Sequence, residues 1–448
     1  MGSPWSSGVA RLLDGSVAVA GVDVAELAAR FGTPLYVLDE AHLRSRARAF
    51  REAFERAFAA VGTGADVYYA GKAFLSVAVA RWVHEEGLAV DASTGGELAV
   101  ALAAGVPGAR IGLHGNNKSD DEIATALDAG VARVVADSLV EVDQLAAVAR
   151  ERGVEIPVMV RVTTGVHAGG HEHIATAHED QKFGLSLTAA PGEDSPAMTA
   201  LLRVVAAPGL RLVGIHSHIG SQVLEPDGFL VAARRVLELR AELAERTGVL
   251  AGEVDLGGGY GIAYLPGEVP LDPERVAKDL ATAMAAVADE LHTPMPRVSI
   301  EPGRGIAGPA GLTLYTVGTV KPVALDGGFV RTYVSVDGGM SDTIRPALYG
   351  ARYHAEIAGR ASSAAPVTAR VVGKHCEAGD VVVSDVELPG DVAAGDLLAV
   401  AATGAYGRSM ASNYNLVPRP AVVAVRDGVA RVLIRRETVD DLLALDQH

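Results

Sequence analysis

From about residue 66 to residue 310 the chain repeats one pattern of hydrophobic and polar positions. A short apolar or β-branched run ends in polar residues and is followed by a longer, alanine-rich stretch. The short runs predict strands and the longer stretches predict helices. The predicted strands begin near Asp66, Leu88, Arg110, Arg133, Pro157, Arg211, Glu253 and Arg297. Strands that alternate with helices pair in parallel, and eight such units predict a closed, TIM-like β/α barrel.

Residues typical of helix ends support the predicted helices. Three helices begin at a hydroxyl residue with glutamate three positions later, a pattern in which both side chains bind free backbone amides. The pairs are Thr94–Glu97, Ser119–Glu122 and Ser138–Glu141. Glycines that can adopt the left-handed conformation of a helix end close four apolar runs. They are Gly87, Gly105, Gly130 and Gly153.

After about residue 312 the pattern changes. Apolar and polar positions alternate and are interrupted by glycine, proline and aspartate, which predicts an antiparallel β domain. The predicted fold class is therefore α/β, a (β/α)8 barrel with a second, mainly antiparallel β domain. We expect the barrel to span residues 34–311. We expect the second domain to comprise residues 312–448, completed by the N-terminal segment 1–33.

Composition narrows the class of protein. The 448 residues carry a formal net charge of -16, which disfavours nucleic acid or an anionic membrane as the main partner. The chain has one cysteine, Cys376, and so cannot form an internal disulfide. No basic segment followed by an apolar run opens the chain, and no apolar stretch reaches the roughly 18 residues of a membrane span. A cytoplasmic enzyme is therefore expected.

Reactive side chains stand where the predicted barrel strands end, which is where barrel enzymes carry their active sites. Lys72 follows the first strand, and a lysine there can either form a Schiff base or extend to solvent. Asp91, His114 and His216 stand at the ends of the second, third and sixth strands. One rim of the barrel is therefore predicted to collect a lysine, carboxylates and histidines.

Two further strand ends are suited to binding anions. Gly257–Gly259 follows the seventh strand and lets the backbone approach an anion, although a plain tight turn also requires glycine. Glu301–Arg304 ends the eighth strand. Its carboxylate can hold a pyridine nitrogen protonated and its arginine can bind phosphate or carboxylate, or the two can form a surface ion pair. His218 can stack on a flat cofactor while Ser221 donates to a phosphate, or it can be a satisfied buried histidine.

Two other features have simpler readings. A polar cluster raises the question of a metal site, and it consists of His171, Glu172, His173, His178 and Glu179. Its spacing is not that of a zinc-protease helix, so we expect no metal and interpret the segment as a polar lid. Cys376 taken by itself is expected to be buried and inert, because free cysteines usually pack as small hydrophobic residues.

Taken together and in this order, the motifs resemble those of the fold type III pyridoxal-phosphate decarboxylases. Within that group they resemble the actinobacterial diaminopimelate decarboxylases. The resemblance runs from about Pro34 to Asp441 and rests on YYAGKAF, DASTGGEL, LHGNNKS, HEDQKFGLS, GIHSHIGSQ, DLGGGYGI, EPGR, VSVDGGMSD, ALYGA, GKHCEAGD, ATGAY and YN. HIGS, GGG and EPGR are shared with ornithine and arginine decarboxylases of this fold.

The resemblance implies a cofactor, pyridoxal 5'-phosphate, held by Lys72 as a Schiff base. It implies that His218 stacks on the ring and that Glu301 pairs with the pyridine nitrogen. The other implied cofactor-binding residues are Asp91, Ser221, Gly258, Pro302, Gly303, Arg304 and Tyr406. The implied substrate-binding residues are Arg304, Arg345, Tyr349, Glu377 and Tyr406. Cys376 is implied to return a proton from the neighbouring subunit of a homodimer.

The implied reaction converts meso-2,6-diaminopimelate to L-lysine and carbon dioxide, the last step of lysine biosynthesis. Glu377 offers a carboxylate to an ammonium and Arg345 offers a fork to a carboxylate, which together suit a diamino diacid. Ala378 departs from the family's usual serine and removes a hydroxyl near the distal end of the substrate. The alternatives are a decarboxylase for another basic amino acid, a racemase on a similar barrel, and a non-catalytic cofactor-holding or partner-binding protein. An oxidoreductase is supported by GGGYG alone.

Overall fold

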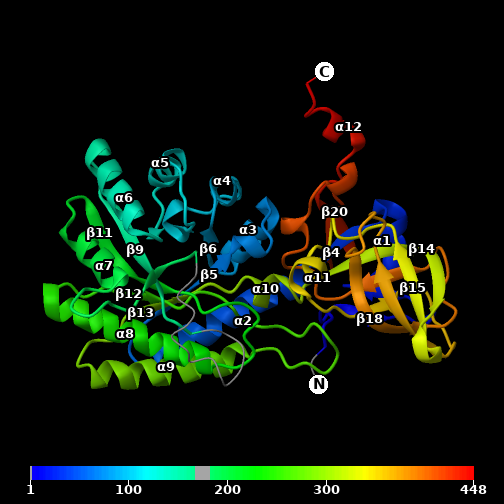
Figure 1. The fold of residues 1–448 in the computed structure, drawn as a ribbon, viewed down its shortest axis with the longest axis horizontal. Coiled ribbons are helices and arrows are strands. Elements are labelled where there is room, and N and C mark those ends of the chain that lie inside the picture. Colours follow the sequence, from blue (N-terminus) through cyan, green and yellow to red (C-terminus); the bar gives the residue numbers. More distant parts are fainter. Residues whose placement is uncertain (1–2, 167–181, 448) are drawn as a thin grey trace. The chain divides into compact units, whose positions relative to one another are not determined.

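The structure, a computed structural model, describes residues 3–166 and 182–447. The chain divides into two compact units. The barrel unit comprises Arg46–Gly261 and Leu271–Gly303, and the sheet unit comprises Met1–Ser45, Ile262–Pro270 and Arg304–His448. In Figure 1 the sheet unit carries both ends of the colour scale, because it is built from the beginning and the end of the chain.

The barrel unit contains a closed ring of eight parallel strands. The strands are β5 (Ala65–Ala70), β6 (Ala89–Ala92), β7 (Ile111–Leu113), β8 (Arg133–Ala136), β9 (Ile156–Thr163), β11 (Leu210–Ser217), β12 (Glu253–Asp255) and β13 (Arg297–Ile300). Pairing of β13 with β5 and of β8 with β9 closes the ring, and the short β10 (Leu185–Ser186) adds to β9. Each predicted strand start falls within one residue of an observed start. The predicted barrel is confirmed.

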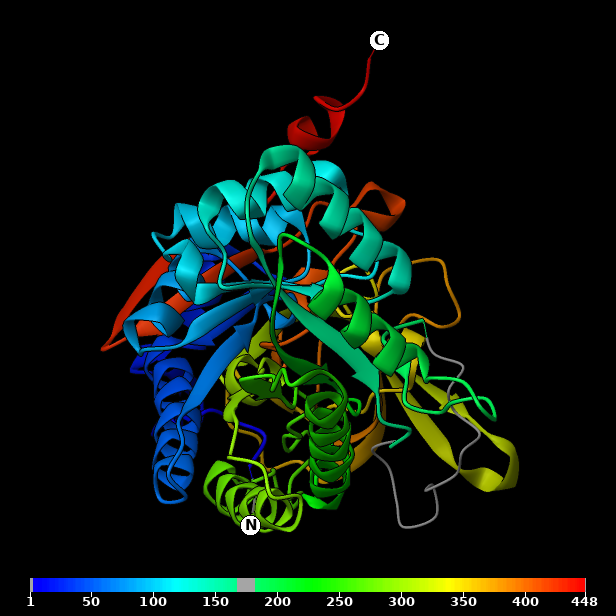
Figure 2. The ribbon, with the colours of Figure 1, turned by 90° about the vertical axis from the view of Figure 1, so that its left-hand side faces the viewer.

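Helices enclose the barrel strands (Figure 2). They are α3 (Val77–Glu85), α4 (Gly95–Ala103), α5 (Asp120–Ala129), α6 (Leu139–Arg152), α7 (Pro196–Ala206), α8 (Asp227–Thr247) and α9 (Pro273–Glu290). Helix α2 (Glu40–Ala59) contains the boundary between the two units. Of the three predicted capping boxes only Ser119–Glu122 is reciprocal. The other two glutamates bind different groups, Glu97 the amide of Ser93 and Glu141 the ammonium of Lys118.

The sheet unit is built around a mainly antiparallel sheet in the order β18-β17-β15-β14-β4-β20-β21, with β19 on β14 and β16 on β19. Its strands are β4 (Leu35–Asp39), β14 (Gly311–Ala324), β15 (Val330–Val336), β16 (Ala355–Ile357), β17 (Pro366–Val372), β18 (Val381–Pro389), β19 (Leu397–Val400), β20 (Ala421–Arg426) and β21 (Val429–Ile434). A three-stranded sheet precedes it, formed by β1 (Val9–Arg11), β2 (Val17–Val19) and β3 (Val22–Asp23). The short helices are α1 (Val24–Phe31), α10 (Arg304–Ala307), α11 (Arg345–Tyr349) and α12 (Val439–Leu443).

Strand β4 differs from the sequence-based expectation, which assigned residues from 34 onward to the barrel. All five of its residues are buried, and it pairs antiparallel with β14 and parallel with β20. It is therefore an inner strand of the sheet unit, packed in an apolar cluster with residues such as Leu314 and Val423. The segment Ile262–Pro270 also belongs to this unit. Within residues 3–166 and 182–447, no helix is both long enough and apolar enough to cross a bilayer.

Candidate active site

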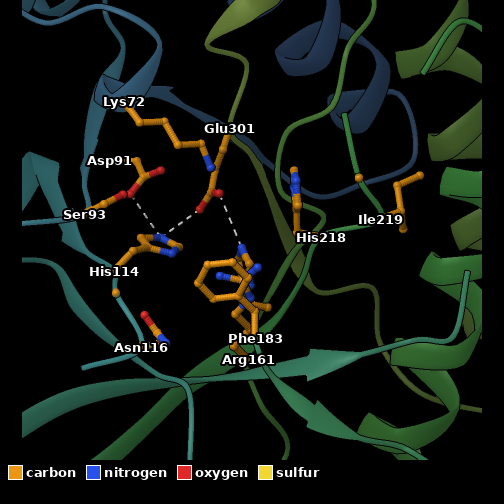
Figure 3. Close-up of a pocket in the computed structure, with 13 residues that line it drawn as sticks. Lys72, Asp91, Ser93, His114, Asn116, Arg161, Phe183, His218, Ile219 and Glu301 are labelled. Carbon is orange, nitrogen blue, oxygen red and sulfur yellow. Dashed lines mark hydrogen bonds and ion pairs between the residues drawn. The ribbon is translucent and has the colours of Figure 1, made fainter. Parts of the chain in front are cut away.

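A cavity of about 450 Å³ opens at the carboxyl ends of the barrel strands. Most of its lining comes from the ends of barrel strands and the turns that follow them, and Phe183 comes from the segment before β10 (Figure 3). The lining residues are Lys72, Asp91, Ser93, His114, Gly115, Asn116, Arg161, Phe183, His216, His218, Ile219, Gly220 and Glu301. The lysine, carboxylates and histidines predicted at the strand ends therefore line one pocket, whereas Gly257–Gly259 and Arg304 are not among its lining residues.

Lys72 lies in the single 3-10 turn Gly71–Ala73 that follows β5. Its side chain points toward Glu301 (Figure 3). It lines the same cavity as the carboxyl groups of Asp91 and Glu301, both at least 96 % buried. Lys72 lines the pocket and is also exposed, so its role as a Schiff-base lysine stays a prediction.

Glu301 is an ionised carboxylate held between two histidines. Its Oε2 lies 3.3 Å from Nε2 of His216 and its Oε1 lies 2.9 Å from Nε2 of His114. Burial acts to raise the pKa of Glu301, but the two histidines hold it well below its usual range. Burial lowers the pKa of His114 to about 3. His114 is therefore a neutral ring at pH 7, and it brings no positive charge to the carboxylate.

Asp91 extends this group of buried acids. Its Oδ1 lies 3.4 Å from Nε2 of His114. Burial, together with the charge of Glu301, raises the pKa of Asp91 well above its usual range. The two carboxyl groups of one pocket are thus pushed in opposite directions, which is the arrangement expected where protons are exchanged.

The Gly257–Gly259 turn follows β12 and joins several groups of the pocket. Gly257 has φ +66° and Gly259 has φ +118°, values that side chains disfavour. The amide of Gly258 donates to Nδ1 of His218 at 3.2 Å, and the amide of Glu301 donates to the carbonyl of Gly257 at 2.8 Å. A Cβ at Gly258 would collide with the carbonyl oxygen of Glu301. Glycine is required here by close backbone packing as well as by dihedral angle.

His218 lines the cavity and is half-buried. Ser221 lies four residues after the end of β11 and is exposed. Burial lowers the pKa of His218 well below its usual range, so its ring is neutral at pH 7. Pro302 and Gly303 are buried beside Glu301. A Cβ at Gly303 would meet the carbonyl oxygen of Ala70 at 2.9 Å, so the eighth strand end packs tightly against the first.

A second group of predicted residues lies in the sheet unit. Arg304 and Arg345 are 9 % and 8 % exposed, and both donate to the hydroxyl of Tyr264. Arg345 also donates to the hydroxyl of Tyr353 at 2.6 Å. The guanidinium of Arg304 lies over the ring of Tyr406, 4.7 Å from its centroid. Arg345 forms no ion pair with a carboxylate in the described part of the chain, so this buried cation is available to an anion.

Cys376 is exposed, which contradicts the expectation drawn from the cysteine alone. The physical reason is its place in the loop between β17 and β18, where Glu377 beside it is exposed as well. The hydroxyl of Tyr414 donates to Glu377. Tyr349, at the end of α11, is 65 % exposed. The predicted roles of these residues toward a substrate stay predictions.

The comparisons with known proteins agree over nearly the whole chain. Residues 40–308 match the family model for the pyridoxal-binding domain of pyridoxal-dependent decarboxylases. The chain is 52% identical over 447 residues to the diaminopimelate decarboxylase of Mycobacterium tuberculosis, covering 99% of this chain and 97% of that protein. It is 44% identical over 432 residues to that of Bacillus subtilis, covering 96% and 95%. The chain belongs to the diaminopimelate decarboxylase family.

Solved structures of the diaminopimelate decarboxylase family share the fold. The M. jannaschii enzyme in complex with L-lysine gives a TM-score of 0.90 at 33% identity, covering 99% of this chain and 98% of that one. The Helicobacter pylori enzyme with L-lysine gives 0.81 at 28% identity, covering 94% and 98%. A lysine/ornithine decarboxylase from Vibrio vulnificus gives 0.73 at 22% identity, which is a likeness of fold alone.

The barrel pocket fits the pyridoxal group that the name of the matched domain implies. Oε1 of Glu301 is buried and has no aligned hydrogen-bond donor among the described residues, so it has room for the N–H of a pyridinium ring. The Gly257–Gly259 turn packs directly against Glu301, and its amide at Gly258 donates to His218 of the pocket. A buried carboxylate oxygen suits a pyridine nitrogen, and a glycine turn lets backbone approach a phosphate.

Some residues of this diaminopimelate decarboxylase family site were not recognisable from the sequence. His114 and His216 could be located at strand ends but not paired with Glu301, and nothing marked Tyr264 or Tyr353. The only sequence feature that pointed to these histidines as site residues was their position at strand ends. His114, His216 and Glu301 also offer three possible metal-ligand atoms within 4.8 Å of one another, although the sequence predicted no metal. The other metal candidate, His171 to Glu179, lies outside the described residues.

Proposed function

We propose that this chain binds pyridoxal 5'-phosphate in the barrel pocket and converts meso-2,6-diaminopimelate to L-lysine and carbon dioxide. The proposal rests above all on one observation, that Lys72 and the ionised Glu301 line the same pocket. Identity of 44–52% over nearly the full length to diaminopimelate decarboxylases supports the choice of reaction. Such an activity completes lysine biosynthesis.

The barrel residues would divide the work of holding the cofactor. Lys72 would attach its aldehyde carbon, His218 would stack on the ring, and Glu301 would accept the pyridinium N–H. The residues proposed to surround the phosphate or lie beside it are Asp91, Ser221, Gly258, Pro302, Gly303, Arg304 and Tyr406. When bound, the ring withdraws electrons from the bond to the departing carboxylate.

The charge states of the pocket residues determine how well Glu301 can accept a hydrogen bond from the cofactor ring. The neutral ring of His114 lies beside Glu301 without adding positive charge, so the carboxylate remains a strong acceptor for a ring N–H. Burial of Glu301 at 4 % exposure keeps water from competing for that hydrogen bond. The neutral ring of His218 suits stacking on a cationic heterocycle, because a protonated imidazole would repel it.

The residues of the sheet unit would select the substrate. Arg345, buried and without a carboxylate partner among the described residues, would bind the distal carboxylate, together with Arg304 and Tyr349. Glu377 would bind the distal ammonium, with Tyr406 nearby. Ala378 leaves the contact that a serine makes in the family to backbone or water.

Cys376 would return a proton to the carbon that lost carbon dioxide. We propose that it does so from the second subunit of a homodimer. Its exposure on the loop between β17 and β18 is compatible with insertion into a neighbouring chain. A thiol with an ordinary pKa near 8.5 is mostly protonated at neutral pH and can act as an acid.

The decisive experiment measures carbon dioxide released from meso-diaminopimelate by the purified chain, with and without added pyridoxal 5'-phosphate. L-ornithine and L-lysine serve as competing substrates. We expect cofactor-dependent release from meso-diaminopimelate, and little from either competitor because neither presents a distal carboxylate to Arg345. Preferred release from ornithine or lysine would overturn the substrate, and no release from any of them would overturn the reaction.

A further inference from the structure

Arg133 is a buried cation that the proposed reaction does not use. It opens β8 and is 1 % exposed. Although β8 pairs only with β7 and β9, the guanidinium of Arg133 reaches across the barrel interior to β12, where it forms ion pairs with Glu253 and Asp255. It also donates to the hydroxyl of Ser299 on β13 at 3.0 Å. One side chain thus ties together strands that are not neighbours.

Such a cation is unusual in its surroundings. Barrel interiors are mostly filled by branched apolar side chains, and a buried ion pair often stabilises no more than apolar residues of similar volume. The guanidinium of Arg133 lies 3.9 Å from the centroid of the Tyr68 ring and 3.7 Å from Oε1 of Glu301. Burying these charged groups costs free energy, so we infer that the ion pairs have a role other than stability.

Asp255 connects this cation to the glycine turn. One carboxylate oxygen, Oδ2, accepts from Arg133 and, at 2.8 Å, from the hydroxyl of Ser299. The other, Oδ1, accepts from the amide of Gly257 at 2.7 Å. Asp255 is fully buried, so no water replaces either set of donors in holding its orientation.

The glycine turn in turn holds two groups of the pocket. The carbonyl of Gly257 accepts from the amide of Glu301, and the amide of Gly258 donates to His218. Glu301 and His218 both line the cavity (Figure 3). A continuous series of hydrogen bonds and ion pairs therefore runs from Arg133 through Asp255 to the turn, and from the turn to both pocket residues.

We propose that Arg133 is a positioning residue for the cofactor: by fixing Asp255 it sets the Gly257–Gly259 turn, and with it the placement of His218 and Glu301. The inference rests on the proposed function, since it concerns the pyridoxal phosphate site. Arg133 touches neither cofactor nor substrate. It acts through the planar fork of its guanidinium, which can hold two carboxylates in fixed directions.

The test measures binding of pyridoxal 5'-phosphate to the cofactor-free protein by absorbance titration, alongside its melting temperature. Removing a supporting residue of a bound group commonly weakens affinity by about 10–100-fold, and we expect a loss of this size for Arg133→Met. Arg133→Lys keeps the charge but cannot bridge both carboxylates. It should recover melting temperature without recovering affinity. A lysine variant that restores affinity would mean that charge alone matters, and would overturn the proposal.

The control is Arg297→Met. Arg297 opens another barrel strand, β13, and also pairs with an aspartate, Asp66, but its side chain is 51% exposed. Exposed pairs contribute little, so this variant should bind cofactor like wild type. Equal affinity of Arg133→Met, Arg297→Met and wild type would leave Arg133 with a structural role only.

Asp255→Asn provides an independent measurement, which decides the matter if Arg133→Met does not fold. The variant should lose affinity by a similar factor because it breaks the same connection to Gly257. Where both single variants fold, the double variant should be no weaker than either, since residues acting in series are not additive. Losses that multiply, or Asp255→Asn binding like wild type, would overturn the inference. A wild-type chain that binds no pyridoxal phosphate would instead remove the proposed function.

Discussion

At Glu301, burial and hydrogen bonding act on one carboxyl group in opposite directions. Burial favours the neutral acid, while His114 and His216 favour the carboxylate and prevail. Asp91, which lies within 3.4 Å of the same histidine, has its pKa raised instead. The difference arises because Glu301 faces two imidazole nitrogens at close range and Asp91 faces the negative charge of Glu301. Small differences in neighbours therefore shift the pKa values of two similar carboxyl groups in opposite directions.

Arg345→Ala tests the proposed distal site at the scale of one residue. Loss of a desolvated, charge-assisted contact should reduce kcat/KM for meso-diaminopimelate by an amount equivalent to about 2–5 kcal/mol. The affinity for pyridoxal phosphate should change little. Steady-state kinetics and a cofactor titration measure the two effects. The matched control is Arg352→Ala, because Arg352 lies seven residues on and is exposed. If Arg345→Ala retained wild-type kinetics, the distal assignment would be wrong.

Asp342 in the sheet unit predicts a pH dependence of stability. Burial raises its pKa to about 6 from 3.8, although Tyr315 and the amide of Gly339 donate to it. The folded state thus binds a proton more tightly than the unfolded state. Its stabilising contribution is complete below pH 4 and is lost as the pH rises through about 6, for a loss of about 2–3 kcal/mol.

Asp342→Asn removes this titration. Relative to wild type, the variant should therefore gain stability between pH 4 and pH 7, whatever constant offset the substitution itself causes. Melting temperatures of both proteins across this range measure the difference. A difference that is flat with pH, or that changes in the opposite direction, would contradict the raised pKa of Asp342.

Among the elements, the glycine turn after β12 is the one whose sequence is most constrained by packing. Gly258→Ala should displace the turn, because its Cβ would collide with the carbonyl oxygen of Glu301. We expect a large loss of pyridoxal phosphate affinity. Gly252→Ala, just before β12, is the control, since its Cβ would meet only Val213 at an ordinary 3.8 Å. Cofactor titration measures the affinity of each variant for pyridoxal phosphate. Equal affinities would argue against a tightly packed turn.

The sequence predicted elements better than it predicted their partners. The barrel strands could be located because each apolar run is followed by its own helix, a local pattern. The segment that forms β4 was placed within the barrel domain, because its partners β14 and β20 lie far along the chain and nothing local indicates them. In the site, Lys72 and Glu301 were recognisable at strand ends. The shared hydroxyl of Tyr264 was not, because nothing local marks a residue that two distant arginines approach.

At the scale of the whole molecule, the proposed dimer can be tested by mixing two defective chains. Lys72→Ala should lose cofactor attachment and nearly all turnover. Cys376→Ala should bind cofactor but lose activity by about 10²–10⁴-fold. A heterodimer of the two would contain one complete site, combining Lys72 of one chain with Cys376 of the other. Its activity should approach about half that of wild type, or about a quarter for a randomly paired mixture.

Carbon dioxide release after refolding the two variants together measures this recovery, and native mass spectrometry verifies that heterodimers have formed. Each variant refolded alone is the control. If heterodimers form without recovered activity, each chain builds its site by itself. The intersubunit role of Cys376 would then be abandoned.

The position of β4 has a consequence for how the protein folds during its synthesis. A ribosome releases Leu35–Asp39 early, but the strands on either side of it, β14 and β20, begin only at Gly311 and Ala421. At about 5–20 residues per second, the nascent strand waits roughly 20–80 s for its second neighbour. The barrel strands β5 to β13 all emerge within that interval. This apolar segment therefore has no strand partner while the barrel strands are synthesised, and we expect a chaperone to bind it during that interval.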